Sequence, residues 1–252
     1  MRVTFLGTGT SQGVPLINCQ CPVCISENQK NKRLRCSVMV ETGDNNILID
    51  TSMDMRQQFL SYRFSRIDAV LYTHAHADHI FGMDELRRFN IIQNEIIPVY
   101  ASGQTMEYLK RTFYYAFTEN ELRPGIPNIR GNIIDGPFQI GSSEIIPIPL
   151  NHGDERIYGF RIGAFAYCTD VNSIPEESYP LLKGLKVLVL TALRERKHPK
   201  HFSLNEAITE AKKINAEMTY FNHVSHILDH DTHNSYLDET MELAYDGLTV
   251  SI

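Results

Sequence analysis

The sequence predicts an α/β fold in which two β-sheets pack face to face and helices cover both outer faces, a four-layer αββα sandwich. Strand patterns cluster in both halves of the chain, and helical patterns flank each cluster. Elements of this kind bury their apolar faces by stacking in layers around a hydrophobic core. The 252 residues contain no internal repeat or long linker, so we expect a single domain over residues 1–252.

In the first half of the chain, strands and helices are expected to alternate. Five runs rich in branched aliphatic and aromatic residues predict strands. These runs are residues 2–6, 37–41, 46–50, 69–73 and 97–101. Helical spacing of apolar residues predicts helices over 54–62, 78–89 and 103–117. The glycine and prolines of "RPGIP" predict a loop over residues 119–136.

The second half contains most of the remaining strand patterns. They cover residues 138–140, 144–150, 158–162, 165–168, 186–191, 218–224 and 248–252. A helix is expected over 203–214, because Ser203 and Glu206 form a capping-box pair before an apolar-periodic run. A second helix is expected near 234–244.

Composition excludes several classes of protein. A net charge of −6 argues against a chain that binds nucleic acid or membrane surfaces non-specifically. No run approaches the roughly 18 apolar residues of a membrane span, and the first residues do not form a signal peptide. Five cysteines fit a reducing cytoplasm better than a disulfide framework. We therefore expect a cytoplasmic protein with no membrane partner and no stable nucleic-acid partner, and a homodimer is left open.

The strongest chemical signal is "THAHADH", residues 73–79, directly after the apolar run "AVLY". It contains four potential metal ligands in six positions: His74, His76, Asp78 and His79. Imidazole and carboxylate ligands together suit zinc, manganese or iron. Residues two apart beyond a strand end can point the same way. We therefore expect the first two ligands to hold one ion and the last two to hold a second.

This segment resembles the H-x-H-x-D-H motif of the metallo-β-lactamase superfamily, whose hydrolases fold as αββα sandwiches. The resemblance implies a metallo-β-lactamase-like fold and a dinuclear metal site in this chain. It also implies three further ligands, each at the end of a strand pattern: His152, Asp170 and His223. In that family the residue matching Asp170 bridges the two ions, and the residue matching Asp50 supports the ligands from behind.

Motifs near the start of the chain make the resemblance specific to one subgroup of this superfamily. "GTGTSQGVP" is followed by C-x-C-x2-C and "CSVMVE", and the likeness continues through "PLNH", "HFSLNEA" and "NHVSH". These features are similar to those of PhnP-type phosphodiesterases, although PqqB-type proteins share a similar opening. The resemblance implies a Cys-rich zinc-binding insertion at about residues 15–35, in which Cys19, Cys21 and Cys24 share a structural zinc with His226. Such a closed four-ligand site leaves no position for water.

Together these features predict a metal-dependent phosphodiesterase that acts on small or cyclic phosphodiesters, such as nucleotide or ribosyl phosphates. Two zinc or manganese ions about 3.5–4 Å apart can share a water and make hydroxide available near neutral pH. His201 is the candidate general acid, because it lies just before the Ser203 cap of a helix whose free N–H groups suit a phosphate oxygen. Asp78 is the second candidate catalytic residue.

Four basic residues surround His201 in the sequence: Arg194, Arg196, Lys197 and Lys200. Two interpretations remain open for each of them. The side chain either attracts an anionic substrate or belongs to a solvated loop.

Other functions share parts of this site. A tRNase Z-like endoribonuclease has the same ligands but needs an arm longer and more basic than any insertion here. A glyoxalase II-like thioester hydrolase has the same two-metal site, but we expect no room after His223 for its helical extension. Zinc β-lactamases of the commonest type lack the histidine directly after Asp78. A non-catalytic metal-binding module is disfavoured because all seven ligand positions are intact.

Overall fold

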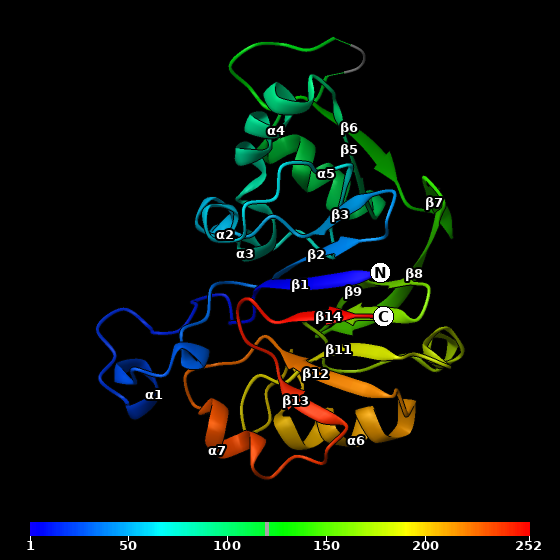
Figure 1. Cartoon of the computed structure of the whole chain (residues 1–252). Coiled ribbons are helices and arrows are strands. Elements are labelled where there is room, and N and C mark those ends of the chain that lie inside the picture. Colours follow the sequence, from blue (N-terminus) through cyan, green and yellow to red (C-terminus); the bar gives the residue numbers. More distant parts are fainter. Residues whose placement is uncertain (119–120) are drawn as a thin grey trace.

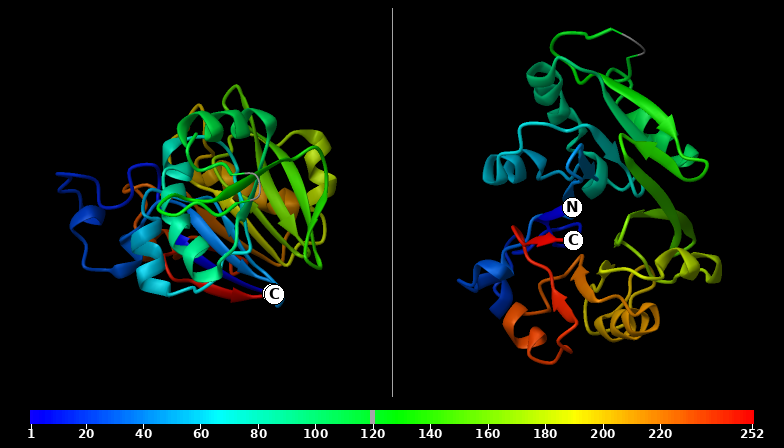
Figure 2. Two further views of the ribbon diagram at one scale, coloured as in Figure 1. Left: turned by 90° about the horizontal axis from the view of Figure 1, so that it is seen from above. Right: turned by 45° about the vertical axis from the view of Figure 1, so that its right-hand side comes forward.

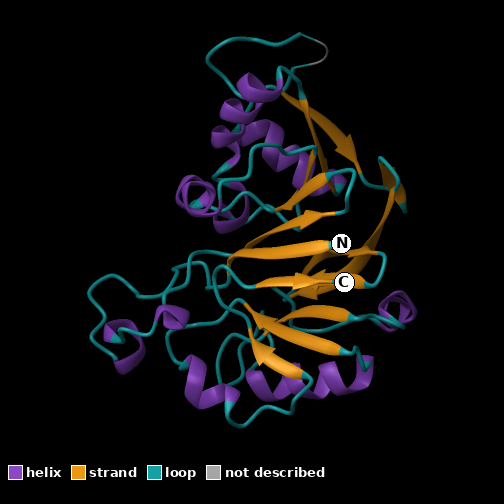
Figure 3. Cartoon of the chain, viewed as in Figure 1, coloured by secondary structure: helices purple, strands orange, loops and turns teal. Residues whose placement is uncertain are grey.

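A computed structural model of the chain describes residues 1–118 and 121–252. Two seven-stranded sheets face each other, and helices flank both (Figure 1). Helices α2 to α5 lie on one side of the strands, and α6 and α7 lie on the other (Figure 3). The predicted four-layer αββα sandwich is therefore confirmed.

The first sheet has the strand order β14-β1-β2-β3-β4-β5-β6. Strands β3 to β6 run parallel, whereas β14, β1, β2 and β3 pair antiparallel. The two ends of the chain lie side by side because β14 pairs with β1 (Figure 2). The strands are β1 (Arg2–Gly7), β2 (Ser37–Glu41), β3 (Asn46–Ile49), β4 (Ala69–Leu71), β5 (Ile97–Ala101), β6 (Ile129–Ile133) and β14 (Thr249–Ser251).

The second sheet has the order β13-β12-β11-β10-β9-β8-β7. Strands β7 to β10 form antiparallel hairpins, and β10 to β13 run parallel. The strands are β7 (Phe138–Ile140), β8 (Ser143–His152), β9 (Glu155–Ile162), β10 (Phe165–Cys168), β11 (Val187–Thr191), β12 (Met218–Asn222) and β13 (Met241–Leu243).

The helices of the described residues are short. The first group covers the first sheet or precedes it: α1 (Pro22–Ile25), η1 (Gln29–Asn31), α2 (Met55–Tyr62), α3 (Ala77–Ile80), η2 (Met83–Glu85), α4 (Leu86–Gln93) and α5 (Gly103–Thr112). The second group belongs to the second half: η3 (Glu176–Leu182), α6 (Leu204–Ile214) and α7 (His230–Asn234). The predicted capping box is present at α6, where Ser203 and Glu206 bond each other's backbone N–H.

Three buried apolar clusters correspond to the three interfaces between four layers. One lies between the sheets and includes Phe5 of β1 and Phe160 of β9. A second joins the outer face of the first sheet to helices through residues such as Val70 and Leu109. A third joins the second sheet to α6 through residues such as Ala207. The fold is therefore held by the burial of apolar faces on both sides of each sheet.

Two predicted elements are wrong. The loop predicted over 119–136, of which residues 119 and 120 lie outside the described residues, contains strand β6. Among the described strands, β6 pairs with β5 alone, at the edge of the sheet, and its Ile129 also bridges Phe117. Its sequence "IRGNI" alternates too weakly to be recognised. The helix predicted near 234–244 is absent as well: α7 ends at Asn234, and β13 follows. The Asn234 side chain accepts from Leu243 N–H, which ties the end of the helix to that strand.

Two predicted helices differ in length. The helix predicted over 78–89 is divided into α3, η2 and α4, with Gly82 at the division. A Cβ atom at Gly82 would collide with the Ser52 carbonyl oxygen, so the chain makes a close approach there that only glycine permits. The helix predicted over 103–117 ends at Thr112.

Candidate metal centre

The predicted ligands gather where strands of both sheets end. Asp50 follows β3, the segment 73–79 follows β4, and His152 is the last residue of β8. Asp170 and His223 follow β10 and β12. Because the carboxyl ends of parallel strands meet at one edge of a sheet, residues far apart in the chain converge at this edge.

Three of these residues turn sharply after their strands. Asp50, Asp170 and His223 have φ angles of +61°, +58° and +57°. This left-handed backbone conformation is uncommon for residues other than glycine, and it costs free energy that the surrounding structure must supply. Among the described residues, four other non-glycine residues share this conformation, but Asp50, Asp170 and His223 are the ones that adopt it just beyond the strand ends at the site.

The first ligand group contains His74, His76, His152 and Asp170, each with one donor atom within 4.8 Å of the others. The Nε2 atom of His74 lies 2.9 Å from His76 Nδ1 and 3.9 Å from an Asp170 oxygen. His152 donates its Nδ1–H to the Lys200 carbonyl oxygen at 2.8 Å. This bond leaves the Nε2 lone pair of His152 available, which is how proteins orient a metal-binding imidazole.

The second ligand group contains Asp78, His79, Asp170 and His223, again within 4.8 Å of one another. His79 Nε2 lies 3.3 Å from Asp78 and 3.4 Å from Asp170, and His223 Nδ1 lies 3.0 Å from Asp170. Asp170 belongs to both groups. The structure therefore brings all seven predicted ligands together, with Asp170 where a bridging carboxylate would lie.

Asp50 holds His79 from behind, as the family resemblance implies. Its buried carboxylate accepts the His79 Nδ1–H at 2.7 Å, together with the backbone N–H and hydroxyl of Thr73 at 2.9 and 2.8 Å. The other nitrogen of His79, Nε2, is buried and has no hydrogen-bond partner among the described residues. A buried imidazole nitrogen that lies 3.3 and 3.4 Å from two carboxylates is the arrangement that a metal cation satisfies.

The charges of the site also fit divalent cations. Burial opposes ionisation of Asp170, but the charges of His223 and His79 outweigh it and hold the Asp170 pKa well below its usual value. Burial by itself would lower the pKa of His223, but the charge of Asp170 and its hydrogen bond raise that pKa to about 10. The site thus contains three buried carboxylates, those of Asp50, Asp78 and Asp170, and these require positive charge nearby. In the metal-free protein, extra protons on the imidazoles of His79 and His223 supply that charge. The residues present fit two divalent ions.

His201 lies between the two groups. Its ring stacks on that of His223, with centroids 4.7 Å apart, and lies 4.8 Å from that of His152. Its Nδ1 is buried without a hydrogen-bond partner in the described chain, 4.0 Å from an Asp170 oxygen. Burial and the charge of His223 lower the His201 pKa to about 3, so the ring is neutral at pH 7. The predicted general-acid role thus requires that His201 first gain a proton.

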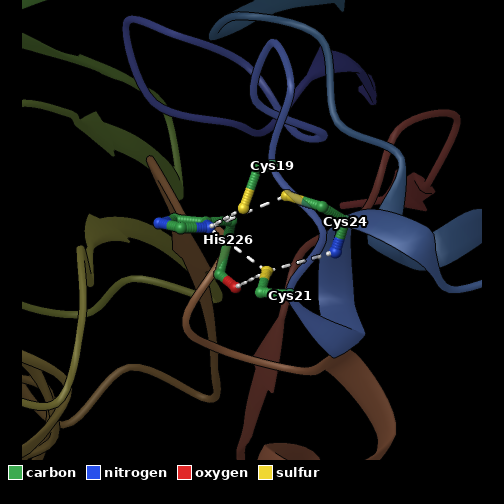
Figure 4. A group of neighbouring side chains, drawn as sticks. All are labelled: Cys19, Cys21, Cys24 and His226. Carbon is green, nitrogen blue, oxygen red and sulfur yellow. Dashed lines mark hydrogen bonds between the residues drawn. The ribbon is translucent and has the colours of Figure 1, made fainter.

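The three N-terminal cysteines meet His226 at a separate site (Figure 4). The Sγ atoms of Cys19, Cys21 and Cys24 lie 3.4, 3.3 and 3.7 Å from His226 Nδ1. Three sulfurs converging on one imidazole nitrogen form the Cys3His set of structural zinc sites, which have no open position. The group joins the N-terminal insertion to the loop after β12.

Some contacts at the site have no signal in the sequence. The Cys36 thiol, one residue before β2, lies 3.1 Å from Asn222 Oδ1 and 3.7 Å from His223 Nδ1. The carbonyl oxygen of Lys200 is a backbone atom that any residue would supply. The glycine-rich loop at 7–13 also reaches the site, where the Thr8 carbonyl oxygen accepts from Val224 N–H beside His223.

The basic residues near His201 have different surroundings. The ammonium of Lys197 lies 3.3 Å from Glu206, and that of Lys200 lies 3.8 Å from Glu155. Arg194, by contrast, lines a pocket that also contains His201 and His223.

Among the described residues, no helix is both long enough and apolar enough to cross a bilayer.

Comparison with known proteins agrees with this geometry. Residues 45–224 match the model of the Beta-lactamase superfamily domain. The solved structure of a new diphosphatase from the PhnP family is 40% identical, with a TM-score of 0.93, and the match covers 100% of this chain and 97% of that one. Zinc-bound PqqB from Methylobacterium extorquens is 19% identical, with a TM-score of 0.81 and full coverage of both chains, and shows the fold alone.

Curated relatives are longer than the part that this chain matches. An octanoyltransferase of Porphyromonas gingivalis is 37% identical over 257 residues, which are 100% of this chain and 52% of that protein. Coenzyme PQQ synthesis protein B of Methylobacterium radiotolerans is 36% identical over 101 residues, 34% of each chain. The chain therefore spans about half the length of the first relative, and its match to the second covers about a third of that protein.

Proposed function

We propose that this chain, which belongs to the metallo-β-lactamase superfamily and within it to the PhnP family, hydrolyses small or cyclic phosphodiesters with two divalent metal ions. The main support for the proposal is the arrangement of the metal-binding side chains around His201. Two groups of His and Asp donors share Asp170, and the unpartnered Nδ1 of His201 lies 4.0 Å from an oxygen of that shared carboxylate. Two-metal sites of this composition suit displacement at phosphorus.

The protein's own residues divide the work. His74, His76, His152 and Asp170 would hold one ion, and Asp78, His79, Asp170 and His223 the other. When bound, zinc or manganese ions would supply the Lewis acidity that activates water and neutralises charge on phosphoryl oxygens. Asp50 and the Lys200 carbonyl fix the orientation and tautomer of His79 and His152, so the donor atoms are in place before substrate arrives.

His201 supplies the proton that the leaving oxygen needs. The ring is neutral in the free protein, but an anionic phosphodiester beside it favours the imidazolium form and raises its pKa. The proton is therefore taken up together with the substrate and is then donated as the P–O bond breaks.

Two other substrate classes have a specific observation in their favour. The 40%-identical structure is that of a diphosphatase, so a diphosphate is the second candidate substrate. The 37%-identical relative is named an octanoyltransferase, so an acyl thioester is the third candidate substrate. Precursor tRNA tests the endoribonuclease alternative.

A side-by-side assay of one metal-loaded preparation tests the proposal. We expect turnover of bis(4-nitrophenyl) phosphate and of a ribosyl cyclic phosphate, and loss of both activities in His76→Ala and Asp170→Ala variants that remain folded by circular dichroism. Turnover of the thioester alone, or of precursor tRNA alone, would overturn the substrate class. Normal turnover by either variant would overturn the assigned ligands, and no turnover of any substrate would favour a non-catalytic metal-binding module.

A further inference from the structure

A pocket of about 300 Å³ extends away from the metal centre beside His201 and His223. Its walls also include Arg194, His198, Ser11 and Ser225, which come from three separate segments of the chain. A substrate whose phosphorus lies at the metal centre has its leaving group beside His201. This pocket is therefore the space available for that group.

The lining of the pocket combines one arginine, several hydroxyl groups and imidazoles with three aliphatic side chains, those of Leu16, Leu193 and Ile227. Arg194 is a permanent positive charge, and no aspartate or glutamate lies among the described residues that line the pocket. An anionic group in this pocket would therefore meet a cation whose charge no carboxylate of the described lining compensates.

The guanidinium of Arg194 is held in place before any ligand binds. Its Nε and Nη2 donate to the carbonyl oxygens of Arg196 and Lys197, at 3.1 and 2.9 Å. The Arg194 carbonyl oxygen accepts from Leu204 N–H at 2.8 Å, which fixes the residue to the first turn of α6. A side chain that is already ordered loses little entropy when it binds an anion.

The neighbouring cations do not share these properties. Lys197 and Lys200 lie near the carboxylates of Glu206 and Glu155, and neither lines the pocket. Arg196 is exposed and lies outside the lining as well. The sequence places all four basic residues near His201, but only Arg194 is positioned to contact a substrate there.

We propose that Arg194 is a specificity-determining residue that selects substrates whose leaving group carries a carboxylate or phosphate of its own. This assignment rests on the proposed phosphodiester hydrolysis. The guanidinium makes charge-assisted hydrogen bonds to that second anionic group, while the metal centre and His201 act on the scissile ester.

Two chromogenic diesters test the assignment. One is bis(4-nitrophenyl) phosphate, and the other is its analogue with a carboxylate beside each nitro group. We expect the wild type to have the lower KM for the carboxylated diester. Arg194→Gln should raise that KM about tenfold or more, because charged hydrogen bonds are lost, and should change the KM of bis(4-nitrophenyl) phosphate, whose leaving groups are neutral, about twofold or less. Arg194→Lys should recover part of the preference, and the matched control Arg196→Gln should keep all of it.

The result separates this inference from the proposed function. An equal rise of KM for both diesters in Arg194→Gln, or a wild type without preference, would overturn the role of Arg194. If neither diester is hydrolysed, the proposed function fails, and calorimetry with the carboxylated diester then tests Arg194 directly. Weaker binding by Arg194→Gln than by the wild type and Arg196→Gln supports the assignment, whereas equal binding by all three proteins contradicts it.

Discussion

Replacing Asp50 by asparagine is expected to weaken the second ligand group by reversing the tautomer of His79. The substitution keeps the size of the side chain, and asparagine tolerates the left-handed backbone at this position. In the wild type one carboxylate oxygen accepts from Thr73 N–H, and the other accepts from His79 Nδ1–H and the Thr73 hydroxyl. An amide offers only one oxygen for these two positions.

The backbone N–H of Thr73 decides which way the amide turns. Because that N–H can only donate, the amide oxygen must face it, and the amide NH2 then faces His79. His79 must accept there through Nδ1, so its proton moves to Nε2 and blocks the lone pair that points at Asp78 and Asp170. Loss of such a supporting contact costs about 10–100-fold in metal affinity or activity.

Metal titration against a chelating indicator measures this effect. In Asp50→Asn we expect one of the two active-site ions to bind about 10–100-fold more weakly, and kcat/KM to fall at limiting metal. Asp54→Asn is the matched control, since Asp54 pairs with Arg35 at 2.9 Å and contacts none of the ligands described above. Wild-type affinity for both ions together with wild-type turnover in Asp50→Asn would refute the reasoning.

Three further predictions follow from named contacts. His201→Ala should lower kcat strongly for substrates with poor leaving groups and less for nitrophenyl esters, measured by steady-state kinetics, and an equal loss for both kinds would contradict proton donation. Cys21→Ser should remove one zinc per chain in native mass spectrometry and lower Tm, whereas three ions per chain in the variant would contradict the Cys3His site. Burial and the charge of Arg33 lower the His230 pKa to about 4 from 6.5. Because the folded state resists this protonation, unfolding free energy should fall as pH drops from 6.5 through 4, and less so in His230→Asn. Denaturant titrations across that range check the sign.

The features that could be predicted from the sequence are those whose residues lie close together in the chain. The donors at 73–79 lie within one short segment after an apolar strand, so their proximity follows from sequence spacing alone. The capping box at Ser203 is local for the same reason. Strand β6 and the pair α7–β13 were mispredicted because their stability comes from pairing with β5 and β12, which a local pattern does not contain.

Sequence patterns predicted the layered fold class and, through the family resemblance, seven candidate metal ligands and the grouping of His226 with the three cysteines, which the structure brings together. Which atoms support these residues follows from the tertiary structure and from no local pattern. The Lys200 carbonyl that orients His152, the thiol of Cys36 beside His223, and the choice of Arg194 over three neighbouring cations have no sequence signature. The physical reason is common to all three. Backbone atoms are the same in every residue, and the direction of a side chain is set by the packing of segments far apart in the chain.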